Sequence, residues 1–238
     1  MKLSHLTTSI LAAGLLIGCA QAESAAESAA TKTTEAAQNT ADKMKKSAEG
    51  MKDKMKPSPP GADISGAVPG VYKSEATHAY ITFQYMHQGY ARPTLRWNDF
   101  EATVNLDPAN PTASTLNVVI DASSIDSGVA KFDEHLVAPD LFDVENHPTI
   151  TFTSTSLNEL STGRGTLTGD LTMKGVTKPV ELSVVLNKVG EHFRSKKPMM
   201  GISAKTSIKR SDWGLGKYTP IVGDDVDISI EVEFLKEE

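Results

Sequence analysis

From about residue 70 onward, apolar and polar residues alternate in short segments of the chain. Ile81, Phe83, Tyr85 and His87 occupy every second position of one such segment. Successive side chains of a strand point to opposite faces, so this spacing places bulky side chains together on one face. Residues 226–235 repeat the pattern, with Val, Ile and Phe alternating with Asp, Ser and Glu. Both segments are predicted strands with one buried and one exposed face.

Turn-forming Gly, Pro, Asn and Asp residues divide the region into several such segments. The predicted strands are residues 71–75, 78–87, 95–106, 115–122, 149–156, 164–174, 179–188, 200–209 and 226–235. Many links between them have hairpin length, which favours an antiparallel barrel or sandwich over a parallel sheet with crossover helices. Residues 124–146 break the pattern. Within them, residues 129–136 could form a short helix, which we expect to cover one end of the barrel.

The first residues have the pattern of a secretory signal. Lys2 precedes an apolar run from Ile10 to Ile17, and the small residue Gly18 follows it. This run is much shorter than the roughly 20 residues that a membrane-spanning helix needs. We therefore expect residues 1–18 to direct export, and we expect no transmembrane helix.

Two processing sites are compatible with this signal. Residues 16–19 resemble a lipobox, in which the cysteine, here Cys19, is acylated and becomes the new N-terminus. Residues 20–22 form an Ala-x-Ala site for ordinary signal peptidase, which would release a soluble periplasmic protein. We favour lipidation of Cys19, because it is the only cysteine of the chain and stands where acylation needs it. Ala20 stands where an inner-membrane retention signal would have Asp, so we expect the outer membrane.

Residues 19–65 have the composition of a tether. Ala, Ser, Thr, Lys and Glu dominate up to Lys56, and a Pro-rich break follows. Residues 40–56 contain good helix formers with Met at helical spacing, so they could form a marginal amphipathic helix. Both a solvated linker and a helix on the membrane surface agree with this pattern. The folded domain is predicted to span residues 66–238.

The composition argues against several classes of function. The chain has 24 Lys and Arg against 30 Asp and Glu, a net charge of −6, which disfavours a nucleic-acid partner. It contains no nucleophile elbow, no His-Glu-x-x-His and no P-loop. The histidines at 78, 87, 135 and 147 lie too far apart for a known zinc signature. We expect no metal, no cofactor and no catalysis, although scattered carboxylates leave a hydrolase as an alternative.

Several blocks of the sequence, taken in order, resemble the YceI family of bacterial periplasmic proteins, and the resemblance extends over nearly all of residues 70–236. The blocks are His78 with Ile81-x-Phe83-x-Tyr85-x-His87, Trp97–Phe100, Ser124–Gly128 with Phe132–Leu136, Leu141–Asp143, Pro148–Phe152, Gly169–Val180, and Lys209–Leu215 with Val222–Val226. Gly169–Lys178 is similar to the family's G-D-L-T-x-x-G-V-T-K. Two features depart from the family: Tyr90–Thr94 is longer and more polar than the usual hairpin, and the Lys-rich tether lies outside the family core.

The resemblance implies a lipocalin-like, closed antiparallel barrel of about eight strands that binds a polyisoprenoid-type lipid. A barrel of this size holds either its own side chains or one slender ligand. The candidate ligand-binding residues are Ile81, Phe83, Tyr85, His87, Phe100, Phe142, Phe152, Leu171, Met173 and Trp213. Each could instead pack in an ordinary core, and Trp213 could plug a barrel end because a Gly-rich turn follows it.

Polar residues could meet a lipid head group at the barrel mouth. His87 follows the apolar positions on the inward face, and Asp133, His135 and Arg210 could also reach the mouth. Caps, turns and salt bridges are alternative roles for these three. Asp170, Lys174 and Gly175 have the chemistry of a hairpin turn. A packed barrel that acts through its surface as an envelope-stress or structural lipoprotein remains an alternative function. The chain could also pair with a second copy of itself.

Lipidation at Cys19 is directly testable. Cells that express the wild-type chain and are fed labelled palmitate should incorporate the label into it, and Cys19→Ala should abolish incorporation because the acylated thiol is missing. Labelling of the Cys19→Ala chain at the wild-type level would contradict the lipobox interpretation.

Overall fold

The computed structural model describes residues 61–158, 160 and 162–238. The predicted signal sequence, Cys19 and most of the predicted tether lie outside these residues. No helix in this part of the chain is long and apolar enough to cross a membrane.

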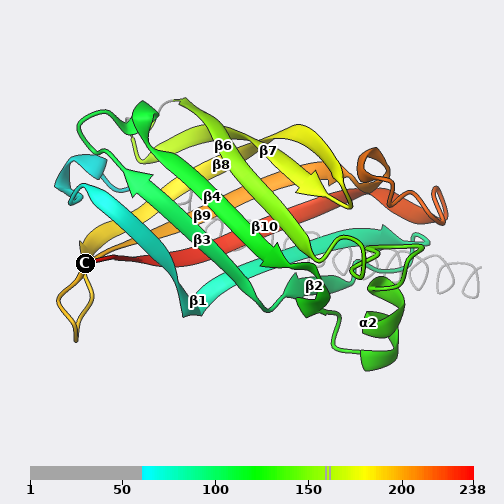
Figure 1. Ribbon diagram of the computed structural model, residues 1–238. Coiled ribbons are helices and arrows are strands. Elements are labelled where there is room, and N and C mark those ends of the chain that lie inside the picture. Colours follow the sequence, from blue (N-terminus) through cyan, green and yellow to red (C-terminus); the bar gives the residue numbers. More distant parts are fainter. Residues whose placement is uncertain (1–60, 159, 161) are drawn as a thin grey trace, which may run out of the picture. The chain divides into compact units, whose positions relative to one another are not determined.

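Eight antiparallel strands form a closed barrel (Figure 1). In their order around the barrel they are β1 (Gly70–His87), β3 (Phe100–Leu106), β4 (Thr115–Asp121), β6 (Thr149–Asn158), β7 (Arg164–Met173), β8 (Val176–Glu191), β9 (Pro198–Lys209) and β10 (Val222–Lys236). β10 pairs with β1 along most of its length, and this pairing closes the sheet. The predicted barrel is confirmed.

β1 is long enough to pair with two different strands, one after the other along its length. Residues 70–73 pair with β3, whereas residues 81–84 pair with β2 (Thr94–Trp97), which in turn pairs with β5 (Ile125–Asp126). β2 and β5 therefore extend the sheet beyond the eight strands at one end. The sequence divided β1 into two strands, and the structure shows one strand with a register shift between Ser74 and Ala79.

The predicted strand 95–106 is wrong in the opposite sense, because the structure divides it into β2 and β3. The break falls at Asn98 and Asp99, whose backbone N–H groups donate to the carbonyl and the hydroxyl of Ser124, at 3.0 Å each. These contacts turn the chain away from the sheet. Ser124 belongs to a 3₁₀ turn just before β5, a two-residue strand that the sequence did not predict.

Helix α2 (Ala130–Leu136) agrees with the predicted short helix, and it lies at one end of the barrel (Figure 1). Leu136 is buried in the apolar cluster of that end, and Phe132 packs against the same cluster. The remaining helices are 3₁₀ turns: η1 (Ile64–Gly66), η2 (Pro111–Ala113), η3 (Ala122–Ser124) and η4 (Arg210–Trp213).

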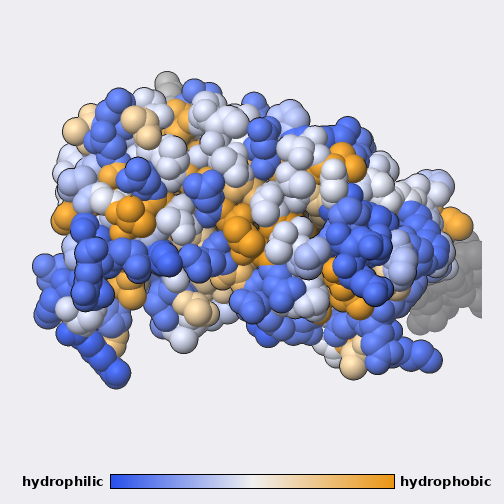
Figure 2. All heavy atoms as spheres, in the orientation of Figure 1, coloured by the Kyte–Doolittle hydropathy of each residue, from blue (hydrophilic) through white to orange (hydrophobic). Residues whose placement is uncertain are grey.

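Alternation along the strands separates the two faces of the wall. Ile81, Phe83 and Tyr85 are buried, whereas Tyr80 and Met86 on the opposite face are exposed. The outer face seen in Figure 2 is mostly hydrophilic, with apolar residues in small separate patches. The inward face therefore carries most of the large apolar side chains of the wall.

Gly169 of β7 offers a test of this packing. A Cβ at this position would lie 2.3 Å from Cζ of Phe152 and 2.6 Å from the Thr153 carbonyl oxygen. Gly169→Ala should therefore lower the free energy of unfolding by about 1–3 kcal/mol, measured by urea denaturation. Gly190→Ala is the control, because the nearest side-chain atom there is 3.7 Å away. Equal stability of both variants would contradict the close packing.

Candidate functional site

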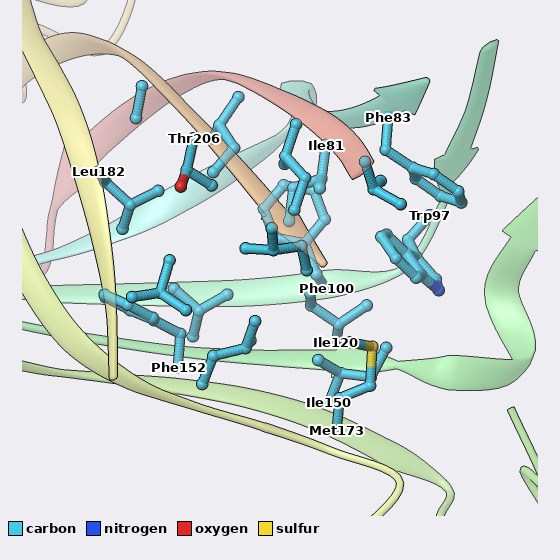
Figure 3. A pocket seen from close by; sticks show the side chains of 18 of the residues that line it. Ile81, Phe83, Trp97, Phe100, Ile120, Ile150, Phe152, Met173, Leu182 and Thr206 are labelled. Atoms are coloured by element: carbon cyan, nitrogen blue, oxygen red, sulfur yellow. The ribbon is translucent and has the colours of Figure 1, made fainter. Parts of the chain in front are cut away.

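The interior of the barrel is an elongated apolar cavity of about 590 Å³. Its wall is built by inward-facing side chains from all eight barrel strands and from β2. The side chains labelled in Figure 3 are Ile81, Phe83, Trp97, Phe100, Ile120, Ile150, Phe152, Met173, Leu182 and Thr206. Thr206 is the one labelled residue with a side-chain oxygen, so this part of the wall offers a ligand almost no polar partner.

Nine of the ten candidate residues line this cavity. They are Ile81, Phe83, Tyr85, His87, Phe100, Phe142, Phe152, Leu171 and Met173. Phe142 comes from the segment after α2 rather than from a strand. That these side chains contact a ligand stays a prediction, whereas their convergence on one space is a property of the structure.

His87 lies at one end of the cavity and is exposed, not enclosed in the barrel. The pairing of β1 with β10 shifts between Tyr85 and His87, and the backbone N–H of His87 donates to the Ala91 carbonyl at 2.8 Å. His87 therefore begins a turn where the alternation predicted a fourth inward position.

Trp213 is the exception among the candidates, because it closes the barrel wall and does not line the cavity. β8 and β9 pair from Ser183 with Lys205 to Glu191 with Pro198. Residues 176–182 of β8 and residues 206–209 of β9 therefore do not pair with each other. A surface groove lies along this gap, and Trp213 is part of its lining. The indole is only 3% exposed, and its Nε1–H donates to the Leu171 carbonyl at 3.1 Å. Trp213 therefore fills a gap in the barrel wall, a position that differs both from the cavity lining and from the plug at a barrel end that the sequence left as an alternative.

An aromatic cluster at the α2 end includes a residue that the candidate set missed. The ring centroids of Phe83 and Trp97 are 4.5 Å apart, and Phe142 packs edge-on against Trp97 at 5.9 Å. Trp97 and Leu95 are both buried lining residues, two positions apart on β2. Their spacing carried the same alternation signal as residues 81–85. The Trp97 Nε1–H is covered by other side chains and has no partner among the described residues, so it offers a ligand no donor.

The segments around residues 140 and 217 meet over the same end of the barrel. Lys217 donates to the carboxylate of Asp140, and this contact raises the pKa of Lys217 and lowers the pKa of Asp140. His135 on α2 lies 3.9 Å from Asp140, and its ring packs edge-on against Tyr218 at a centroid distance of 6.3 Å. The two segments thus form a polar rim over an apolar interior.

Arg210 holds the second of these segments in place. Its guanidinium donates to the carbonyls of Leu215, Lys217, Val222 and Gly223. Burial lowers the pKa of Arg210, and the same side chain lines the cavity. Arg210 therefore has a structural role, and it also brings a positive charge to the cavity mouth.

Other polar candidates lie elsewhere. Asp133 accepts a hydrogen bond from the Ser127 N–H at 2.8 Å, which ties the start of α2 to the preceding turn. Lys174 and Gly175 form the β7–β8 turn with positive φ angles of 49° and 73°. The described residues contain no group of three His, Cys, Asp or Glu that could hold a metal ion.

Residues 72–234 match the family described as the YceI-like domain. The chain belongs to this family. Protein YceI of Escherichia coli O17:K52:H18 is 36% identical over 169 residues, which cover 70% of this chain and 87% of that protein. A UPF0312 protein of Pectobacterium atrosepticum is 34% identical over 182 residues, covering 74% and 92% of the two chains.

Solved structures of YceI-like barrels share the fold. BcnA of Burkholderia cenocepacia has a TM-score of 0.61 at 24% identity, over 67% of this chain and 98% of that one. A polyisoprenoid binding domain from Saccharophagus degradans, implicated in plant cell wall breakdown, has a TM-score of 0.54 at 14% identity, over 70% and 98% of the two chains. At these identities the likeness concerns the architecture alone.

The role of Trp213 as a wall residue predicts a large effect on stability. Trp213→Ala should lower the free energy of unfolding by about 3–5 kcal/mol, because a buried indole is removed. Trp213→Phe should cost less, because it keeps most of the packing and loses the hydrogen bond to Leu171. Phe193→Ala, at a side chain that is 72% exposed, is the control for urea denaturation. A Trp213→Ala variant as stable as this control would contradict the assignment.

Proposed function

We propose that this protein binds a long apolar lipid of isoprenoid type in the barrel cavity and holds it away from water without transforming it. The observation that carries the proposal is the continuous apolar cavity of about 590 Å³. Small-molecule sites in proteins span roughly 300–1,000 Å³ and combine an apolar lining with few polar groups. The elongated space and the narrow set of polar residues fit a slender chain with one polar end.

Burial of the lipid tail supplies the driving force. An isoprenoid tail exposes several hundred Å² of apolar surface, and sequestration yields about 25 cal/mol per Å² before ordering costs. This gives several kcal/mol without any directed contact along the tail. The Saccharophagus degradans domain, which is similar in fold, is described as a polyisoprenoid binding domain.

The cavity also separates this proposal from its alternatives. A structural lipoprotein that acts only through its surface would have no need for an empty apolar interior, and a packed barrel of this size could be filled by its own side chains. A hydrolase would need a nucleophile or an activated water beside the bound lipid. The wall around the tail carries apolar side chains at nearly every position.

The proposal includes a place in the cell envelope. The signal-like residues 1–18 would direct export, and an acylated Cys19 would anchor the barrel to a membrane through the segment that follows. A lipid carrier in this position would hold its ligand close to the bilayer from which the ligand comes.

Blocking the cavity tests the proposal. Val118 packs against all three apolar clusters of the interior, whereas its neighbour Val119 is 48% exposed on the outer face of β4. Val118→Trp should reduce the lipid that copurifies with the protein by about tenfold or more, because the new ring occupies the space of the tail. The measurement is mass spectrometry of lipids extracted from protein purified from its own envelope.

Val119→Trp is the matched control, since it adds the same ring one residue away on the other face. Its lipid content should equal that of the wild type. Circular dichroism shows whether each variant folds. Absence of any long-chain lipid from wild-type protein, or equal lipid in both variants, would overturn the proposal.

A further inference from the structure

Arg210 and Lys217, the Arg and Lys side chains of the cavity lining, are both cationic. The lining includes Arg210, Lys217, His87 and His135, and no Asp or Glu is found in it among the described residues. This contrasts with the chain as a whole, which has 30 acidic against 24 basic residues. Carboxylates are therefore abundant in the chain but do not face the ligand space.

These four residues also lie at one end of the cavity. Arg210 and Lys217 follow β9, His135 belongs to α2, and His87 ends β1, all at the α2 end of the barrel in Figure 1. The opposite end is lined by uncharged residues, among them Ile64, Ser114, Thr115 and Leu160. The cavity thus has a cationic mouth and a neutral far end.

A free hydroxyl group accompanies the charges. Tyr85 lines the cavity and is only 9% exposed, yet its hydroxyl has no hydrogen-bond partner among the residues that the structure describes. Burial raises the pKa of Tyr85, and Arg210 is close enough to oppose this shift. The hydroxyl stays protonated at neutral pH and is available as a donor beside a guanidinium.

The neighbouring carboxylates are engaged elsewhere. Asp224 accepts from the backbone N–H and the hydroxyl of Ser211 at 2.9 and 2.7 Å, and it does not form an ion pair with Arg210. Asp140 binds Lys217 from outside the lining, and that side-chain pair is partly exposed. Arg210 therefore lines the cavity without a direct ion pair, and the negative charge of Asp224 acts on its guanidinium from nearby. Lys217 lines the cavity while its Nζ pairs with Asp140 and lies 4.8 Å from the centroid of the Tyr218 ring.

We propose that the ligand carries an anionic head group of the phosphate type, held at the α2 end by Tyr85, Arg210 and Lys217. The inference rests on the proposed function and adds the chemical class of the head group and the orientation of the lipid. The tail extends from the aromatic cluster of Phe83, Trp97 and Phe142 toward the neutral end. Charge-assisted hydrogen bonds to an anion are about twice as strong as neutral ones, so the mouth discriminates between head groups.

The test compares two lipids with the same tail, geranylgeranyl monophosphate and geranylgeraniol, each below its micelle-forming concentration. Trp97 in the cavity wall supplies a fluorescence signal for binding. The wild type should bind the monophosphate roughly tenfold more tightly than the alcohol at low salt. The difference in affinity between the two lipids should become smaller as salt is added, because exposed charges such as Lys217 are screened.

Two variants assign this preference to the mouth. Lys217→Gln and Tyr85→Phe should each reduce the affinity difference between the monophosphate and the alcohol to about threefold or less. Unchanged binding of the alcohol shows that the cavity is intact. Lys209→Gln is the matched control for the first, since Lys209 forms a similar pair with Asp225 at 2.8 Å but does not line the cavity. Tyr80→Phe is the control for the second, because the hydroxyl of Tyr80 bonds to the Thr77 carbonyl outside the barrel. Arg210 stays unchanged, because its four backbone contacts hold the mouth.

The outcomes separate the two proposals. If the wild type binds both lipids equally, or if Lys217→Gln keeps the full preference, the head-group inference is overturned and the lipid-binding function stands. If neither lipid binds, both fail. A preference that is lost in Lys217→Gln and Tyr85→Phe and retained in both controls supports the inference.

Discussion

The structure depends on the closure of one antiparallel sheet by the pairing of β10 with β1. Closure removes both sheet edges and turns one face of every strand toward the same axis, so the sequence alternation becomes a division between inside and outside. The side chains on that axis are mostly aliphatic and leave about 590 Å³ between them. An apolar void of this size forfeits dispersion contacts that a packed core would have. The empty barrel is therefore less stable than a fully packed barrel of the same size would be.

The wall departs from regular pairing where the ends of the cavity are shaped. β1 exchanges β3 for β2 along its length, and this exchange brings Trp97 into the aromatic cluster of the α2 end. β8 and β9 separate before the end of β9, and Trp213 fills the gap from η4. Both irregularities lie at the end that also carries α2, Arg210 and Lys217. The far end remains a plain barrel with uncharged lining. The asymmetry gives a bound chain two different environments along one axis.

The sequence predicted the strands well where alternation is local. The pattern at Ile81, Phe83 and Tyr85 located an inward face, and nine of the ten candidate residues line the cavity. The predictions were wrong where contacts between residues far apart in the sequence determine the structure. Ser124 divides β2 from β3 across more than twenty residues of sequence, and no local signal reveals it. Trp213 was misplaced as a candidate because its position depends on a gap between β8 and β9. Alternation could not tell whether the interior was full or hollow, because that depends on the summed volume of all inward side chains.

An empty apolar cavity couples stability to occupancy. A ligand that binds only the folded barrel shifts the folding equilibrium by mass action, and the shift grows with the ratio of its free concentration to its dissociation constant. In the proposed complex, the tail would restore contacts that the empty wall lacks, while the mouth would add polar contacts for one end of the lipid. Tail burial therefore sets most of the affinity, since it scales with apolar area and tolerates variation in chain type. Selectivity among lipids with equal tails must then come from the few polar groups at the α2 end, which is why the sign of their charge matters more than their number.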